Sequence, residues 1–70
     1  MEVREAIRRA RLEKGLSQKE LADAIHVAQT NVSQWERGST RPKARNLKRL
    51  AEVLGKPVDY FFGDQPQIGR

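Results

Sequence analysis

The sequence contains no cysteine, a single histidine, and only one Trp, one Tyr and two Phe among its 70 residues. The absence of cysteine excludes disulfides and thiolate metal sites. No apolar run approaches the roughly 20 residues that a membrane-spanning helix needs, and the charged N-terminal stretch has no apolar signal segment after it. We therefore expect a cytoplasmic protein with no membrane partner and no metal site.

Catalytic motifs are also lacking. The chain has no cysteine nucleophile, no Ser-His-Asp set, no phosphate-binding glycine loop and no cluster of metal-ligand residues. Seventy residues make one small domain, close to the lower size limit for folding without disulfides or metals. We predict that the protein is not an enzyme and has no cofactor and no small-molecule ligand.

The apolar residues recur at helical spacing, and no strand pattern occurs. Gly15, Gly38 and Gly55 are typical helix stops, and Ser17 with Glu20 forms a capping box. The pattern predicts a compact all-α domain over residues 1–63, with residues 64–70 as a flexible tail or the start of a linker. The five helices expected cover residues 2–14, 18–25, 28–37, 43–54 and 57–62.

The helices expected at 18–25 and 28–37 are joined by a short turn, and the second has an unusual polar face. Val32 and Trp35 share its apolar side, whereas its other positions carry uncharged amides and hydroxyls. An ordinary surface helix is the alternative, but such helices favour Glu, Lys and Arg. Amides and hydroxyls can pair with base edges in the major groove. The pattern therefore indicates a helix-turn-helix that reads DNA. The polar residues are Gln29, Thr30, Asn31, Ser33 and Gln34.

The formal net charge is +5 and the isoelectric point is about 10.3. Residues 37–49 contain six cations and no acidic residue, whereas the first helix mixes both signs. A solvated surface is the alternative, but the one-sided distribution favours contact with phosphates. The six cations are Arg37, Arg41, Lys43, Arg45, Lys48 and Arg49.

Over about residues 4–63 the chain resembles the lambda-repressor-like (XRE/Cro) family of helix-turn-helix domains. Many matched positions at fixed spacing make this signal far more specific than one short motif. The residues that carry the resemblance are Leu16-Ser17-Gln18, Leu21-Ala22, Val27, Gln29, Val32-Ser33, Trp35-Glu36, Gly38, Pro42, Leu47, Leu50-Ala51 and Leu54-Gly55.

The resemblance implies roles for individual residues. Gln18 would donate to a phosphate and brace the recognition helix, and Arg11 would form an ion pair with Glu36 that ties the first helix to the third. Base contacts are implied for Gln29, Thr30 and Gln34, with Asn31 and Ser33 as further candidates. Contacts to phosphates or to the neighbouring minor groove are implied for Arg37, Arg41, Lys43 and Arg45.

Two residues depart from the family pattern in the turn. His26 replaces the usual glycine, so a left-handed conformation there would be strained. A pH switch or a metal ligand is an alternative for His26, although the chain has no second histidine to share a metal. Ala28 replaces the usual Ser or Thr cap of the recognition helix, a change that typically costs about 1 kcal/mol.

The aromatic segment Tyr60-Phe61-Phe62 has two interpretations. It can close the core, or part of it can face a second subunit, since three adjacent aromatics cannot all point inward from one short helix. We expect a homodimer with Val58, Tyr60 and Phe61 at the interface. Two recognition helices would then lie about one DNA turn apart, over a near-palindromic operator.

These observations predict a sequence-specific regulator of transcription that binds double-stranded DNA, most simply a dimeric repressor. One alternative is an antitoxin or adaptor that grips a partner protein through its third or fifth helix. Another is the DNA-binding part of a longer repressor, for which the composition of residues 64–70 resembles the start of a linker.

Overall fold

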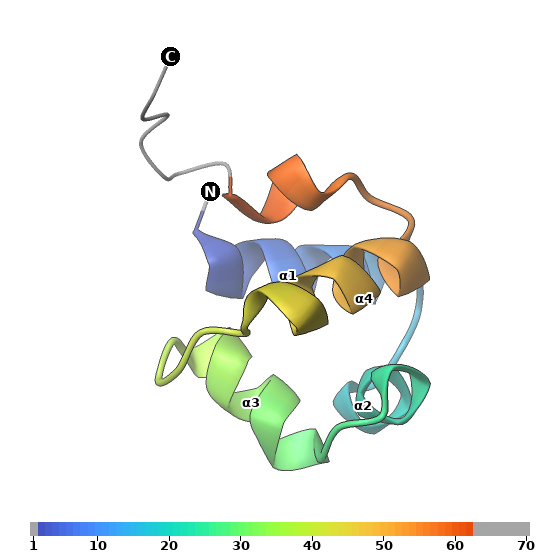
Figure 1. The fold of residues 1–70 in the computed structure, drawn as a ribbon. Coiled ribbons are helices and arrows are strands. Elements are labelled where there is room, and N and C mark those ends of the chain that lie inside the picture. Colours follow the sequence, from blue (N-terminus) through green and yellow to red (C-terminus); the bar gives the residue numbers. More distant parts are fainter. Residues whose placement is uncertain (1, 63–70) are drawn as a thin grey trace.

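The computed structural model describes residues 2–62, which are all-helical as predicted and contain no strand (Figure 1). The expected count of five α-helices is not confirmed, because the last element is a 3₁₀ helix, in which Tyr60 N–H bonds the carbonyl of Pro57 at 3.0 Å. Five residues are too few to build a lasting ladder of i→i+4 bonds. Residues 64–70, predicted to be a tail, lie outside the described part. The elements are α1 (Val3–Glu13), α2 (Gln18–Ile25), α3 (Gln29–Arg37), α4 (Ala44–Leu54) and η1 (Val58–Phe62).

Local sequence explains where α2 begins. The backbone N–H of Glu20 donates to Ser17 Oγ at 3.0 Å, and the N–H of Ser17 donates to Glu20 Oε1 at 2.8 Å. This capping box satisfies two N–H groups that the helix start would otherwise leave without partners. It explains why the predicted start of α2 agrees with the structure.

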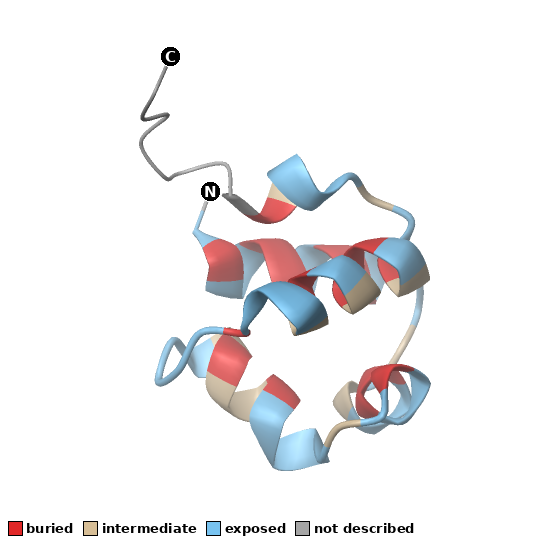
Figure 2. Cartoon of the chain, viewed as in Figure 1, coloured by how far each residue is buried: buried red, intermediate tan, exposed pale blue. Residues whose placement is uncertain are grey.

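The helices enclose one core, into which each turns a single apolar face (Figure 2). α3 packs on α1 and α2, α2 packs on α4, and η1 covers α1 and α4 on the side away from α3 (Figure 1). Only Val32 and Trp35 of α3 enter this core, so most of that helix remains available to solvent. The core residues are Val3, Ala6, Ile7, Ala10, Leu21, Ala22, Ile25, Val32, Trp35, Leu47, Leu50, Ala51, Leu54 and Phe61.

The turn between α2 and α3 carries both of the predicted weaknesses. His26 adopts the left-handed conformation, with φ 63° and ψ 45°, and no other non-glycine residue among 2–62 has a positive φ. Ala28 is the N-cap of α3 and its side chain makes no capping hydrogen bond. The local sequence therefore destabilises this turn twice, through a strained backbone at His26 and through the missing side-chain cap at Ala28.

Relief of either weakness should stabilise the domain. We expect His26→Gly to raise the free energy of unfolding by about 0.5–1 kcal/mol, because glycine accepts a positive φ without steric strain. Ala28→Asp should add about 1 kcal/mol by capping α3. Urea unfolding measures both changes.

The matched control is Ala24→Gly at an exposed position in the last turn of α2, which should lower stability by up to about 1 kcal/mol. An equal loss on His26→Gly would contradict the strain that we assign to the turn.

Candidate nucleic-acid interface

The outer surface of α3 carries all five residues predicted to contact bases. Gln29, Thr30 and Asn31 are exposed, and Ser33 and Gln34 are partly exposed. None is packed in the core, which only Val32 and Trp35 of α3 enter. The first turn of α3 is accordingly exposed in Figure 2. A surface of amides and hydroxyls is thus presented on a rigid helix.

A hollow of about 380 Å³ lies between α3 and the segment that leads into α4. It brings Asn31 and Gln34, predicted to contact bases, next to Arg41 and Lys43, predicted to contact phosphates. Side chains predicted to contact bases and side chains predicted to contact phosphates therefore line the same surface. The residues lining the hollow are Asn31, Gln34, Trp35, Thr40, Arg41, Lys43 and Asn46.

Two of the lining residues, Thr40 and Asn46, were missed by the sequence analysis. Asn46 lies in the first turn of α4, three positions after the N-cap Lys43. A polar amide in the first turn of a helix that follows a basic loop is a signal that could have identified it. Arg45 is exposed on the same turn but does not line the hollow.

The electrostatics of the hollow favour an anion. Lys43 is the N-cap of α4 and provides no side-chain hydrogen bond to the first turn. The N-terminus of a helix carries a partial positive charge and backbone N–H groups that can donate hydrogen bonds to an anion. The exposed cations Arg41 and Lys43 add full positive charges beside it.

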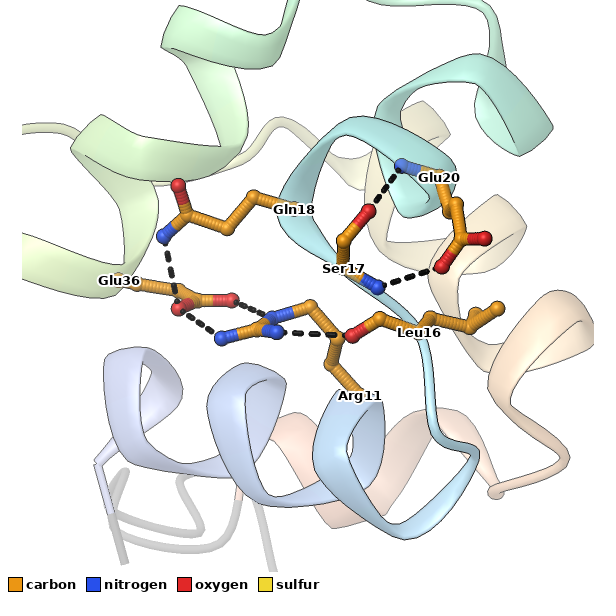
Figure 3. A network of polar contacts seen from close by, with 6 residues as sticks. All are labelled: Arg11, Leu16, Ser17, Gln18, Glu20 and Glu36. Atoms are coloured by element: carbon orange, nitrogen blue, oxygen red, sulfur yellow. Dashed lines mark hydrogen bonds and ion pairs between the residues drawn. The ribbon is translucent and has the colours of Figure 1, made fainter.

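A buried polar network connects α3 to α1 and to the start of α2 (Figure 3). Arg11 Nε donates to Glu36 Oε2 at 2.7 Å, and Arg11 Nη2 donates to Glu36 Oε1 at 3.0 Å. The two side chains are only 10% and 5% exposed. Arg11 Nη1 also donates to the carbonyl of Leu16 at 2.8 Å. The structure thus contains the ion pair that the resemblance implied, and each of the three guanidinium nitrogens of Arg11 makes a hydrogen bond.

Gln18 belongs to the same network. Its Nε2 donates to Glu36 Oε1 at 3.1 Å, so the residue braces α3 from the first turn of α2 (Figure 3). An amide nitrogen carries two hydrogens. One of them remains for the phosphate contact that the resemblance implied.

On the outer face of α3, Arg37 Nη1 donates to Ser33 Oγ at 2.7 Å. Residues four apart on a helix are neighbours, so the guanidinium lies back along the exposed surface. Ser33 and Arg37 were predicted to contact a base and a phosphate respectively, and the structure joins them directly.

The residues predicted for a dimer interface lie apart from this surface, on η1. Phe61 is fully buried, so its inclusion in the interface was wrong: its ring fills the space between α1 and α4. Tyr60 is partly exposed, and its ring meets that of Phe61 edge-on at a centroid distance of 5.3 Å. Val58 is 39% exposed. Only Val58 and Tyr60 of the predicted set are accessible to a second copy.

The described residues provide neither a cluster of metal-ligating side chains nor a membrane-spanning helix. In the part of the chain from residue 2 to residue 62, no three His, Cys, Asp or Glu side chains come together in a way that could hold a metal ion. Over the same residues every helix is too short or too polar to span a bilayer. His26 stands exposed at its turn.

The chain matches the model of the family described as helix-turn-helix over residues 7–61. It is 32% identical over 63 residues to an uncharacterised HTH-type transcriptional regulator of Sinorhizobium medicae, covering 90% of this chain and 45% of that protein. It is 42% identical over 50 residues to the HTH-type transcriptional regulator DicA of Escherichia coli, covering 70% of this chain and 37% of DicA. The chain thus spans less than half the length of these curated relatives.

Among solved structures, the chain is similar to the P22 c2 repressor, crystallised in complex with a synthetic operator. The TM-score is 0.82 at 33% sequence identity, over 87% of this chain and 92% of that one. The arrangement of helices therefore agrees over most of the chain, with about a third of the residues identical.

The Arg11–Glu36 pair generates a stability prediction. Glu36→Ala should lower the free energy of unfolding by about 3 kcal/mol, because it leaves a buried guanidinium without its carboxylate. Replacing both residues, as Arg11→Met with Glu36→Leu, should lower it by about 1 kcal/mol or less. Urea unfolding of the single variants Arg11→Met and Glu36→Leu and of the double variant gives the coupling energy.

The exposed pair Lys19–Asp23, with nitrogen and oxygen 3.2 Å apart, is the matched control. Lys19→Ala should change stability by about 0.5 kcal/mol or less. Strictly additive losses at Arg11 and Glu36 would show that the two side chains act independently, against this account.

Proposed function

The chain belongs to the helix-turn-helix family, in agreement with its lambda-repressor-like sequence pattern, and on that premise we propose that it is a sequence-specific regulator of transcription that binds double-stranded DNA. The observation that carries the proposal is the exposed amide-and-hydroxyl surface of α3 beside a hollow lined by cations. A helix of this kind fits the major groove of B-DNA, where each base pair displays a distinct set of donors and acceptors.

The roles divide between two sets of side chains. Bases are read from α3 by Gln29, Thr30 and Gln34, with Asn31 and Ser33 alongside. Phosphates are held by Gln18, Arg37, Arg41, Lys43 and Arg45, and the start of α4 supports them. The first set supplies sequence preference, whereas the second supplies affinity that depends on salt.

The regulator acts in the cytoplasm as a repressor and binds a near-palindromic operator as a homodimer. The similarity to a repressor crystallised with its operator supports this, as does the position of η1 away from α3. Val58 and Tyr60 would meet their counterparts in the second copy while both recognition helices face the duplex. No catalytic step is involved. A module that only grips a partner protein through η1 would leave the polar surface of α3 and the cationic hollow without a use.

Selection of bound fragments from a random pool of duplexes tests the function, since it reports preference, symmetry and half-site spacing together. The selected duplex and a random duplex of equal length are then compared at several salt concentrations. We expect preference for the selected duplex and a steep fall of affinity with salt. Equal affinity for both duplexes at low salt would refute sequence-specific binding.

Two variants separate the roles. Gln34→Ala should weaken binding to the selected duplex by about 1–3 kcal/mol and relax preference at one position per half-site. Lys43→Ala should weaken both duplexes similarly and reduce the slope of log affinity against log salt by about 1 per half-site. Mobility-shift titration measures both; the same loss on both duplexes for Gln34→Ala would reject its role at a base.

The dimer has a separate test. Val58→Asp should move the protein toward monomer in sedimentation velocity, weakening self-association at least about tenfold, because a charge would enter an apolar contact. Leu12→Asp changes an exposed apolar residue of α1, 55% exposed, and should leave self-association unchanged. Monomeric unmutated protein on DNA, or equal effects of the two variants, would count against an interface at η1.

A further inference from the structure

Arg49 belongs to the run of cations at 37–49, but it contacts the protein itself. Its Nη1 donates to the backbone carbonyl of Ile25 at 3.3 Å, and the side chain is partly buried. Ile25 is the last residue of α2 and directly precedes His26. One cation of α4 is therefore used to hold the end of the first helix of the motif.

The contact supplies the C-terminal end of α2 with a positive charge that the helix itself lacks. The last carbonyls of a helix have no partners within it and carry a partial negative charge, which cations in the last turn normally offset. The last turn of α2 contains no basic residue. Arg49 brings that charge from α4, which packs against α2.

The same end of α2 leads into the turn that carries the two local weaknesses described above. His26 is strained in the left-handed conformation, and Ala28 gives α3 no side-chain cap. Only three residues separate the carbonyl that Arg49 holds from Gln29, the first residue of α3. An anchor at Ile25 therefore bears directly on the orientation of the first turn of α3.

We propose that Arg49 is a positioning residue: it holds the C-terminal end of α2 and the 26–28 turn, and so aims the first turn of α3 at the bases, without itself contacting a phosphate. The proposal rests on the DNA-binding function proposed above. It predicts that loss of Arg49 impairs recognition of sequence more than attraction to DNA.

The test compares Arg49→Met, which keeps an apolar stem but removes the charge and the donor, with Lys48→Met. Lys48 is the neighbouring cation on α4 and is exposed. Affinity is measured for the selected duplex and for a random duplex over a range of salt. Arg49→Met should weaken binding to the selected duplex about fivefold, leave the random duplex within about twofold, and leave the salt slope unchanged. Lys48→Met should leave the ratio of the two affinities unchanged.

Equal losses on both duplexes with Arg49→Met, together with a salt slope reduced by about 1 per half-site, would identify Arg49 as a phosphate contact and overturn the proposal. Unchanged affinity for the selected duplex would overturn it as well.

A second readout needs no DNA. The N–H of Val27 bonds the carbonyl of Ala22 at 3.0 Å, across the end of α2. Arg49→Met should speed amide hydrogen exchange at Val27 about fivefold while core amides of α1 stay protected. In a His26→Gly background, where the turn is not strained, the effect should fall below about twofold.

DNA affinity and amide exchange test the two proposals separately: the first tests sequence-specific DNA binding and the second tests the anchor at Arg49. Failure of the unmutated protein to prefer any duplex would overturn the function, even with faster exchange at Val27. Unchanged exchange at Val27 in Arg49→Met would overturn the anchor, even in a protein that binds DNA as proposed.

Discussion

The buried ion pair between Arg11 and Glu36 sets the orientation of α3, on which the rest of the interface depends. Apolar burial of Val32 and Trp35 attaches the helix to the core, but burial is non-directional and tolerates rotation. A guanidinium that meets both oxygens of one carboxylate accepts a narrow range of angles. A hydrogen bond from Gln18 in α2 to the same carboxylate further restricts the orientation of α3. The network therefore contributes a defined orientation more than net stability, since buried pairs often only offset their own desolvation.

This arrangement leaves α3 largely free for a partner. Two core residues and one buried carboxylate dock the helix, so its remaining positions can carry groups chosen for recognition. Arg41, Lys43 and the start of α4 lie beside that surface, whereas Arg37 lies on it and bonds Ser33. Attraction to a polyanion is thus supplied largely by a different segment from the one that discriminates among sequences.

Local sequence signals predicted much of this molecule. The capping box set the start of α2, and helical spacing identified the core faces and the outward amides of α3. The family pattern pointed to Arg11 and Glu36, 25 positions apart. These features could be predicted because each depends either on residues within one helix or on a pattern that the whole family shares.

What the sequence could not predict depends on packing between elements. Phe61 and Tyr60 are adjacent, and only the docking of η1 on α1 and α4 decides that Phe61 is buried. Arg49 looked like the other cations of its run, and its bond to Ile25 exists only because α4 crosses the end of α2. Thr40 and Asn46 were missed for the same reason, since the hollow forms between separate segments.

The most direct measurement of DNA recognition through α3 is the change in backbone amide NMR shifts when a selected duplex is added. The largest changes should fall on Gln29–Gln34 and residues 40–46, with little change on residues 58–61. Changes concentrated on the outer face of α1 or on η1, with α3 unaffected, would contradict DNA recognition through α3.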